Sequence, residues 1–366
     1  FAILYWNNEH AYDQWNPNKE NAYMVLNKIG ATGDTWGSNS IPFGETCKAT
    51  IPEIEKICFF NTWYDEDIIK YQGQKLMAKK ITVSDESFFD FFPFEILKGA
   101  KTNVLKEKNS VAISEDQAKL IFKNEDPIGK SITYGTNAYT VKSVYRITKP
   151  SSMEPNYVFS GVKRENDINS WGNFNYGLLV KIKKGADPVA VLKKMQNVNY
   201  VNRTLKDAKE NGQTVEQYVK ENGEITVILD QLQMSRLHGT KSSAGQNFPE
   251  GVGNLKLLYI MAGLSILILV LSLVNYINLA TASAIKRAKE VGVRKIVGAT
   301  KNQIITQFIF ETAIIVVLAI VFALAIVELS LPYYNTFLKK TLTMNGSEFY
   351  LQLIMIFGLV IILAGI

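Results

Sequence analysis

The stretch TASAIKRAKEVGVRKIVGATKNQIITQFIFE, Thr281–Glu311, lies between two long apolar segments and carries most of the basic charge near either of them. Between Ile285 and Asn302 the basic residues outnumber the single acid Glu290; they are Lys286, Arg287, Lys289, Arg294, Lys295 and Lys301. A basic run of this kind also occurs in nucleic-acid-binding proteins. Because this one joins two apolar segments, it favours a connection on the cytoplasmic side of a membrane, where positive charge accumulates, and nucleic acid is not expected as a partner.

The two parts of the chain differ in polarity. Phe1–Glu250 is polar and mixed, whereas Leu255–Ile366 is mostly apolar, so the mean hydropathy near zero is an average over two unlike parts. With 366 residues, of which 47% are hydrophobic, the chain is longer than one ordinary domain needs. The pattern predicts a large water-soluble part followed by a membrane part.

Apolar segments of membrane-spanning length follow the polar part. Leu257–Ile285 contains no charged residue, and at 1.5 Å per residue it is longer than the ~30 Å hydrocarbon core of a bilayer. A second span is expected from about Ile304 to Val327, and Phe349–Ile366 begins another. Phe1–Trp6 is typical of the end of an apolar helix, with aromatic side chains at the membrane interface. The expected transmembrane domain is α-helical with four spans, of which the first and last are incomplete.

The basic stretch decides the expected topology. If residues 285–302 are cytoplasmic, one crossing along Leu257–Ile285 places the polar part outside the membrane, between the first and second spans. The polar connection Leu331–Ser347 is then outside as well. The expected division is residues 1–6 as the end of the first span, 7–250 as an extracytoplasmic domain, and 251–366 as the transmembrane domain.

Polar side chains inside the spans are expected to mark contacts between helices. In Leu257–Ile285 they favour one side of the helix, and they are Ser265, Ser272, Asn275 and Asn278. In lipid such groups need protein partners, so this side predicts a helix–helix interface. Glu311 lies in the first turns of the next span. It is either a functional acid within the membrane or a carboxylate at the membrane interface, paired with Lys301 or Arg294.

The polar part alternates between strand and helix patterns. Strands are expected at Tyr23–Ile29, Cys58–Tyr64, Ile81–Val83, Ser110–Ile113, Lys130–Tyr134, Ala138–Arg146, Tyr157–Gly161, Gly177–Lys183 and Ile225–Leu232. Helices are expected from Pro52, over Glu115–Phe122 with a capping box at Ser114–Gln117, and from Pro188 to about Met195 with Asp187 as its N-cap. The aromatic run Phe88–Phe94 is assigned to the core. The mixture predicts an α+β domain of two subdomains, followed by a Gly/Ser-rich connector at His238–Gly253.

One short motif, DPIGKS at Asp126–Ser131, resembles a nucleotide-binding loop. A P-loop has a glycine where Asn124 stands here, and a helix follows it whose N-terminus binds phosphate. In this chain alternating strand residues follow instead. The motif therefore predicts a turn. No nucleophile with a base, no paired-carboxylate site and no dinucleotide fingerprint stands out, so no catalytic residue is expected.

A metal site is not expected either. The two cysteines are Cys47 and Cys58 and the two histidines are His10 and His238, and neither pair has the spacing of metal ligands. The cysteines could form a disulfide if this part of the chain faces an oxidising compartment, or they could be two unpaired structural thiols. The sequence leaves both alternatives open.

If the basic stretch is helical over about 285–302, it has two different faces. Small and apolar residues spaced by three and four share one face: Ile285, Ala288, Gly292, Ile296 and Ala299. Arg287, Glu290 and Arg294 share the opposite face, where Glu290 can pair with both arginines. Such a helix either lies in the membrane interface with its cations directed to water, or docks against a partner. Gly292 and Gly298 permit close approach and a sharp turn into the next span.

At this stretch the residues resemble a known family. RAKEVGVRKIVGATKNQIITQFIFE, Arg287–Glu311, is similar to the signature of the ABC-transporter permeases typified by the macrolide exporter MacB, the lipoprotein-releasing permeases and FtsX. With its flanking spans this resemblance covers Leu257 to about Val327. Ala11–Val25 resembles the segment after the first span in a double-module branch, although Met24 stands where that branch usually has Arg. Further segments resemble the family's periplasmic core domain: Ile81–Gly99, Val111–Phe122, Glu125–Arg146 and Leu178–Met195.

The resemblance implies that the chain works by mechanotransmission. A separate cytoplasmic ATPase would bind ATP and Mg²⁺, with no cofactor in this chain, and long helices would convey its movement to the periplasmic domain. The coupling role would fall to Arg287, Glu290, Gly292, Arg294, Lys295, Gly298 and Ala299. The resemblance also implies a multi-pass protein of the bacterial inner membrane, in contact with lipid and with a second copy or second module of the permease.

Three functions fit this architecture. The first is export of a periplasmic or membrane-derived substrate, such as a peptide, a lipoprotein or lipid, or a drug-like molecule, with a periplasmic adaptor and an outer-membrane channel as further partners. The second is regulation, in which the domain outside the membrane activates a partner such as a cell-wall hydrolase and nothing is transported. The third is sensing of envelope stress or antimicrobial peptides. The size of the extracytoplasmic domain favours export mildly.

Overall fold

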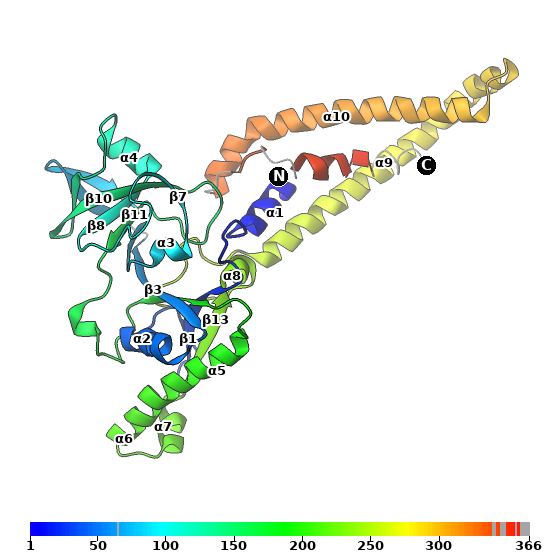
Figure 1. Cartoon of the computed structure of the whole chain (residues 1–366). Helices are drawn as coiled ribbons and strands as arrows, with labels where there is room; N and C mark the ends of the chain where they lie inside the picture. Colours follow the sequence, from blue (N-terminus) through cyan, green and yellow to red (C-terminus); the bar gives the residue numbers. More distant parts are fainter. Residues whose placement is uncertain (64–65, 339–341, 345–348, 356, 359–366) are drawn as a thin grey trace. The chain divides into compact units, whose positions relative to one another are not determined.

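The computed structural model of this chain describes residues 1–63, 66–338, 342–344, 349–355 and 357–358 (Figure 1). The chain divides into two compact units. The sheet unit is His10–Gly253, and the helical unit consists of Phe1–Glu9 together with Asn254–Ile366. Each unit has a hydrophobic core of its own.

Thirteen strands within the described part of the sheet unit form one continuous sheet. They are β1 (Ala22–Ile29), β2 (Thr35–Trp36), β3 (Ile54–Trp63), β4 (Asp67–Tyr71), β5 (Gln74–Ala78), β6 (Ile81–Ser84), β7 (Glu95–Gly99), β8 (Ser110–Ser114), β9 (Ser131–Tyr134), β10 (Asn137–Arg146), β11 (Tyr157–Ser160), β12 (Gly177–Ile182) and β13 (Ile225–Gln231). The order across the sheet is β13-β1-β12-β3-β6-β11-β8-β10-β9-β4-β5, with β2 beside β1 and β7 beside β10.

Helices and shorter turns connect these strands (Figure 1). They are α2 (Ile41–Thr50), α3 (Phe88–Phe91), α4 (Glu115–Phe122), a 3₁₀ turn (Glu165–Asp167), α5 (Pro188–Asn199), a π-helical turn (Tyr200–Thr204), α6 (Leu205–Glu210), α7 (Val215–Asn222) and α8 (Leu232–His238). The expected α+β class of this part is thereby confirmed.

Four strands and two helices form a split βαβ subdomain, which we call the βαββαβ core. In chain order it is β1-α2-β3 followed by β12-α5-β13, and the strands lie side by side as β13-β1-β12-β3, all antiparallel. This is the ferredoxin-like arrangement, in which each helix crosses between strands that are not neighbours. Residues 64–176, between β3 and β12, are therefore an insertion into this core, and we call them the insert.

β1 is buried on both of its faces because each face of the sheet has its own cover. Tyr23 and Val25 pack with side chains of α2 and α5 on one face. Met24 and Leu26, which alternate with them, pack on the other face with aromatic side chains of the insert. The aromatic run Phe88–Phe94 lies in this second cluster, so its expected core position is confirmed. The insert is thus joined to the βαββαβ core through apolar packing as well as through the sheet.

Some expected elements differ from the structure. The helix predicted from Pro52 is wrong: the helix is α2, with Pro42 in its first turn, and β3 begins at Ile54. Proline fits either position, because in the first turn of a helix no backbone donor is lost. The β4–β5 hairpin was not foreseen, although Gln72 and Gly73 both have positive φ angles, 47° and 81°. Positive φ at both turn residues is typical of the tight turns that join antiparallel strands.

Two helix starts were expected from capping residues, with different outcomes. Asp187 accepts a hydrogen bond from the backbone N of Val189 at 2.9 Å, so this N-cap is confirmed. At α4 the helix begins after Ser114 as expected, but the Ser114 hydroxyl makes no capping hydrogen bond. Gln117 instead accepts from the Tyr157 hydroxyl at 2.6 Å, because β11 brings that tyrosine within reach.

The two cysteines are free thiols in separate parts of the core. Cys47 on α2 belongs to the cluster that packs against α5, whereas Cys58 on β3 belongs to the cluster that packs against the insert. Burial raises the pKa of both thiols. Of the two alternatives left open by the sequence, unpaired structural thiols describe this structure.

The helical unit contains two long helices, α9 (Leu255–Ile296) and α10 (Lys301–Leu338). Most of the short helix α1 (Ala2–Ala11) also belongs to this unit, and its last two residues belong to the sheet unit. Within the described residues, Leu255–Ser283 and Lys301–Leu338 are long and apolar enough to cross a membrane, with mean hydropathies of 2.7 and 3.0. Of the expected last span, the residues described, 349–355 and 357–358, are helical, and the remainder lies outside the described residues. The four-span arrangement stays a prediction.

α10 is longer than the sequence predicted. The connection expected from Leu331 is wrong at its start, because the helix continues through Pro332 to Leu338. Proline removes one backbone donor from a helix, and neighbouring hydroxyl groups make other bonds to the helix carbonyls here. Ser330 donates to the Ile326 carbonyl at 2.5 Å, and Thr336 donates to the Pro332 carbonyl at 2.9 Å. Proline within a helix is commonly tolerated in membrane proteins.

The N-terminal residues pack inside the helical unit. Leu4 is 5% exposed and forms a cluster with Leu342 and Phe349. Asn7 and Gln352 exchange two amide hydrogen bonds, at 2.8 and 3.3 Å. Residues from opposite ends of the chain therefore meet in one small core.

Candidate functional site: the turn between α9 and α10

The basic stretch is divided between two helices. The sequence predicted a coupling helix over about 285–302, and the structure places 285–296 in the last turns of α9 and 301–302 in the first turn of α10. Four residues, Val297–Thr300, join them, and we call these four residues the tip turn. α9 has 42 residues, so at 1.5 Å per residue it is about 63 Å long, roughly twice the hydrocarbon thickness of a bilayer.

Gly298 ends α9 in a Schellman motif. Its φ angle is 100°, a conformation that favours glycine. The backbone N of Ala299 donates to the Arg294 carbonyl at 3.0 Å, and the N of Gly298 donates to the Lys295 carbonyl at 3.1 Å. These two bonds satisfy carbonyl groups that the helix end leaves without partners.

Thr300 begins α10 with a reciprocal pair of bonds. The backbone N of Gln303 donates to the Thr300 hydroxyl at 3.4 Å, and the Gln303 side chain accepts from the backbone N of Thr300 at 2.9 Å. This is the capping-box arrangement, which satisfies two backbone donors at a helix start. The sequence VGATKNQ therefore specifies a helix end, a turn and a helix start within seven residues.

A chain of polar side chains connects the two helices across the tip turn. Glu290 and Arg294 form an ion pair at 2.5 Å, one helical turn apart, as the sequence predicted. Arg294 also donates to the Gln307 side chain, and Gln307 donates to Glu311 at 3.2 Å. The Arg287 side chain, the other expected partner of Glu290, lies outside the described residues. Because both members of the ion pair are about half exposed, the pair itself contributes only about 0.3–0.5 kcal/mol.

Apolar side chains around the tip turn are exposed. Ile296 is 88% exposed, Val297 is 82% and Val293 is 60%. No heavy atom lies within 4 Å of the position that a Cβ would take at Gly292 or Gly298, so both glycines face open space. Lys289 and Lys295 are exposed beside these side chains. A surface that combines exposed aliphatic side chains with exposed lysines is suited to a protein partner or to a membrane surface.

The remaining candidate residues in α9 lie on its surface. Ser265, Ser272, Asn275 and Asn278 are all exposed, and within the described residues they are not brought against another helix. Ser265 donates to the Met261 carbonyl of its own helix at 2.8 Å. The helix–helix interface expected from these four residues therefore stays a prediction.

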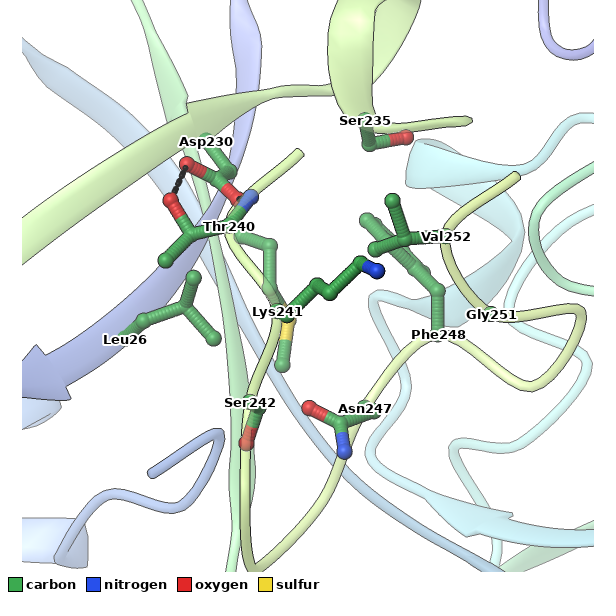
Figure 2. A pocket seen from close by; sticks show the side chains of 11 residues that line it. Leu26, Asp230, Ser235, Thr240, Lys241, Ser242, Asn247, Phe248, Gly251 and Val252 are labelled. Carbon is green, nitrogen blue, oxygen red and sulfur yellow. Dashed lines mark hydrogen bonds between the residues drawn. The ribbon is translucent and has the colours of Figure 1, made fainter. Parts of the chain in front are cut away.

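The sheet unit contains a pocket that the sequence did not indicate. Its volume is about 290 Å³, and it lies between β1, β13 and the Gly/Ser-rich connector (Figure 2). Met24 and Leu26 contribute apolar surface from β1, and Lys241 extends into the pocket from the connector. The Asp230 carboxylate in its wall accepts hydrogen bonds from the backbone N and the hydroxyl of Thr240, at 2.5 and 2.9 Å.

In the described part of the chain, no group of three or more His, Cys, Asp or Glu side chains is arranged to hold a metal ion.

Comparisons with known proteins agree with this division of the chain. A model of the MacB-like periplasmic core domain matches residues 11–198, and a model of the FtsX-like permease C-terminal domain matches residues 262–366. A macrolide export ATP-binding/permease protein MacB from Neisseria gonorrhoeae is 24% identical over 260 residues, which cover 68% of this chain and 35% of the relative. The protein of the same name from Aggregatibacter actinomycetemcomitans is 24% identical over 240 residues, covering 63% and 32%. The chain thus spans about a third of the length of the curated relatives it matches.

Two solved structures resemble part of the chain. A domain described as belonging to a permease protein from Porphyromonas gingivalis covers 59% of this chain and 92% of its own, at 17% identity and a TM-score of 0.47. The periplasmic region of MacB from Actinobacillus actinomycetemcomitans covers 57% and 88%, at 15% identity and a TM-score of 0.39.

Proposed function

This chain belongs to the MacB-like and FtsX-like permeases of ABC transporters, a family of inner-membrane permeases with a periplasmic domain, and from that premise we propose that it transmits ATP-driven movement from a cytoplasmic ATPase to its sheet unit. The ATPase is a partner that binds ATP and Mg²⁺, and this chain contributes no catalytic residue. The substrate is a periplasmic or membrane-derived molecule, such as a peptide, a lipoprotein or lipid, or a drug-like compound, which the moving sheet unit expels.

One observation carries the proposal: the tip turn combines a rigid backbone with an exposed apolar and basic surface. The Schellman motif and the capping box hold the turn between two long helices. Ile296 and Val297, which lie beside Lys295, are more than four-fifths exposed. A partner that binds this surface can displace both helices together, because the turn between them is short and fully hydrogen-bonded. Arg287, Glu290, Gly292, Arg294, Lys295, Gly298 and Ala299 are the residues proposed to form the dock.

The ion pair could instead serve only to stabilise the helix, and a pair of charge variants separates this role from docking. Arg294→Glu breaks the ion pair and reverses the charge shown to a partner. The double variant Glu290→Arg with Arg294→Glu restores the ion pair in the opposite order while leaving the surface charges exchanged. If docking is the role, both variants lose stimulation of the ATPase; if only helix stability matters, the double variant regains it.

The measurement is ATP hydrolysis by the ATPase that co-purifies with the full chain, reconstituted in lipid nanodiscs with each variant. A decrease of at least tenfold in ATPase stimulation in both variants supports the dock, and unchanged stimulation in Arg294→Glu contradicts it.

A second experiment, identification of the proteins that co-purify with the intact complex, distinguishes export from regulation. Co-purification of a periplasmic adaptor and an outer-membrane channel supports export, whereas co-purification of a cell-wall hydrolase supports regulation and contradicts export.

A further inference from the structure

Four segments of the sheet unit, distant in sequence, meet in one buried polar cluster. They are Tyr12–Trp15 near the start of the unit, Pro150–Glu154 in the insert, Ser235–Arg236 in α8, and Glu250–Gly253 at the end of the unit. The first and last segments are those through which the chain passes from the flanking helices into the sheet unit and out again. We call the four segments together the clasp.

Asp13 is the centre of one half of the clasp. Its side chain is fully buried and accepts hydrogen bonds from the Ser151 hydroxyl at 2.8 Å and from the backbone N of Ser152 at 3.0 and 3.1 Å. The backbone N of Asp13 donates to the Pro150 carbonyl at 3.0 Å, and the Trp15 indole donates to the same carbonyl at 3.1 Å. The start of the sheet unit is therefore bonded to one short loop of the insert.

The other half of the clasp bonds the end of the sheet unit to the same loop. The hydroxyls of Ser152 and Ser235 are 3.3 Å apart, and the backbone N of Glu250 donates to the Ser152 carbonyl at 3.4 Å. Arg236 donates to the Glu250 carbonyl and, at 3.1 Å, to the Gly251 carbonyl. The backbone N of Gly253 donates to the Arg236 carbonyl at 2.5 Å.

Further contacts reinforce both halves. The Arg236 guanidinium lies 4.3 Å from the centre of the Tyr12 ring, which connects the two ends of the unit directly. Lys80, in the insert, forms an ion pair with Glu250 at 2.7 Å and a longer one with Glu154 at 3.6 Å. Burial raises the pKa of the Asp13 carboxyl, while the bonds from Ser152 and Ser151 oppose that rise.

The clasp is dry. Asp13 and Ser151 are 0% exposed, Ser152 is 1%, and Ser235 and Arg236 are 5% and 7%. A buried polar group that loses its hydrogen-bond partner is left unsatisfied, which is costly. Because the bonds of this cluster share residues, we expect the cluster to open as a whole or to stay closed. Displacement of one end of the sheet unit therefore cannot leave the loop Pro150–Ser152 behind without exposing unsatisfied donors and a carboxylate.

We propose that the clasp is the joint that makes the insert move with the two helices flanking the sheet unit, and that Asp13 is its positioning residue. Residues 64–176 also attach to the rest of the sheet unit through β3–β6 pairing and apolar packing. Hydrogen bonds add to this attachment: Asn16 and Asn18 donate to backbone carbonyls of Phe91 and Asp90. The clasp bonds them to both chain ends at one loop. This inference rests on the proposed function, because it assumes that the flanking helices move when ATP binds.

The test uses hydrogen exchange of the full chain in complex with its ATPase in nanodiscs, with and without a non-hydrolysable ATP analogue. The variant is Asp13→Gly, which removes both acceptor oxygens and fits the φ angle of 58° at this position without strain. Its matched control is Asn103→Gly, an exposed position in the insert with a φ angle of 55°. Asp13→Asn is the conservative variant, since asparagine keeps one oxygen and also tolerates positive φ.

In the wild type and in Asn103→Gly, the ATP analogue is expected to change exchange at the tip turn, at residues 150–153 and in the insert strands β8 and β10. In Asp13→Gly the change at the tip turn is retained, while the changes at residues 150–153 and in the insert fall to less than half. Asp13→Asn recovers part of the response. Ser151→Ala, which removes a single hydroxyl, gives the same direction with a smaller loss and serves if Asp13→Gly does not fold.

The outcomes separate this inference from the function on which it rests. If the wild type shows no ATP-dependent change at the tip turn, the proposed function is wrong. If the wild type responds at both places and Asp13→Gly and Ser151→Ala respond equally at both, the tip turn transmits movement but the clasp does not carry it, and the inference is overturned.

Discussion

The tip turn and the clasp are both hydrogen-bonded joints, but they differ in exposure and in reach along the chain. The tip turn is built from residues within one short stretch, and its apolar side chains face open space. The clasp joins residues from the start, middle and end of the sheet unit, and its central side chains are buried. A docking surface has to stay accessible so that a partner can bind and leave, whereas a joint that transmits displacement has to resist opening. The difference in burial matches these two requirements.

The largest effect is expected from opening the clasp. Asp13→Gly leaves the Ser151 hydroxyl and the Ser152 backbone N without acceptors at buried positions, so the free energy of unfolding of the sheet unit should fall by about 2–3 kcal/mol. Denaturant unfolding followed by tryptophan fluorescence measures it. A loss as small as that of the control Asn103→Gly would show that the clasp is not tightly closed.

Gly298→Val should disturb the tip turn by a smaller amount. A β-branched residue at a φ of 100° costs about 1–2 kcal/mol or breaks the Schellman bonds. Because the end of α9 is exposed, we expect local loosening rather than global unfolding, seen as faster hydrogen exchange at residues 297–300 and reduced ATPase stimulation. Gly263→Ala, within α9 at a glycine outside the dock that also has open space at its Cβ position, is the matched control and should leave the exchange at residues 297–300 and the ATPase stimulation unchanged. Equal effects of the two substitutions would mean that the turn geometry is unimportant.

Ile296→Asp should leave stability unchanged and weaken ATPase binding. The side chain is 88% exposed, so the chain loses no packing, while removal of an apolar anchor from an interface typically costs about tenfold in affinity. Titration of the nanodisc-embedded chain with the ATPase measures the affinity. Leu120→Asp, at a residue 64% exposed on α4 of the sheet unit, is the control and should bind normally. Unaltered affinity in Ile296→Asp would show that this side chain does not contact the ATPase.

Thr300→Ala is expected to have the smallest effect of the substitutions. Loss of the N-cap hydroxyl costs about 1 kcal/mol in helix stability, and the adjacent Schellman motif still holds the turn. Hydrogen exchange at Asn302 and Gln303 should therefore rise about fivefold with little change in ATPase stimulation. Thr300→Ser retains the hydroxyl and should behave as the wild type, and if it matches Thr300→Ala the capping bond does not form.

The pH dependence of the clasp has a defined sign. Burial raises the folded-state pKa of Asp13, so its contribution to stability, compared with that of Asp13→Asn, is greatest below the unfolded pKa near 3.8 and declines as pH rises through the folded pKa. The difference in unfolding free energy between wild type and Asp13→Asn, measured from pH 3 to pH 7, should decline with rising pH. A difference that grows with pH would mean that the carboxylate is stabilised as an anion.

The sequence predicts the tip turn better than the clasp, for a physical reason. Gly298 and the pairing of Glu290 with Arg294 act within one or two helical turns, so they are visible in a short window. Asp13 and Ser151 are 138 positions apart, and nothing local to either indicates the other. The same holds for Gln117, whose expected capping bond was replaced by a bond from Tyr157 in a strand 40 positions away.

Strands with a buried apolar run or a clear alternation were expected, whereas short edge strands with a single buried residue were missed. β1 has a continuous buried run and was expected, whereas β4 and β5 alternate between exposed and buried residues at the edge of the sheet. In β5 only Ala78 is fully buried. Short edge strands with lysine at several positions, such as Lys70 and Lys75, have little hydrophobic signal.

Labelling of a single cysteine beside the tip turn shows whether this end of α9 is cytoplasmic and docks on the ATPase. Ile296→Cys in the full chain is exposed to a membrane-impermeant maleimide in vesicles of known orientation, with and without the ATPase; the native Cys47 and Cys58 are buried. We expect labelling from the cytoplasmic side only, and protection when the ATPase is bound. Labelling from the opposite side, or labelling that the ATPase does not reduce, would contradict it.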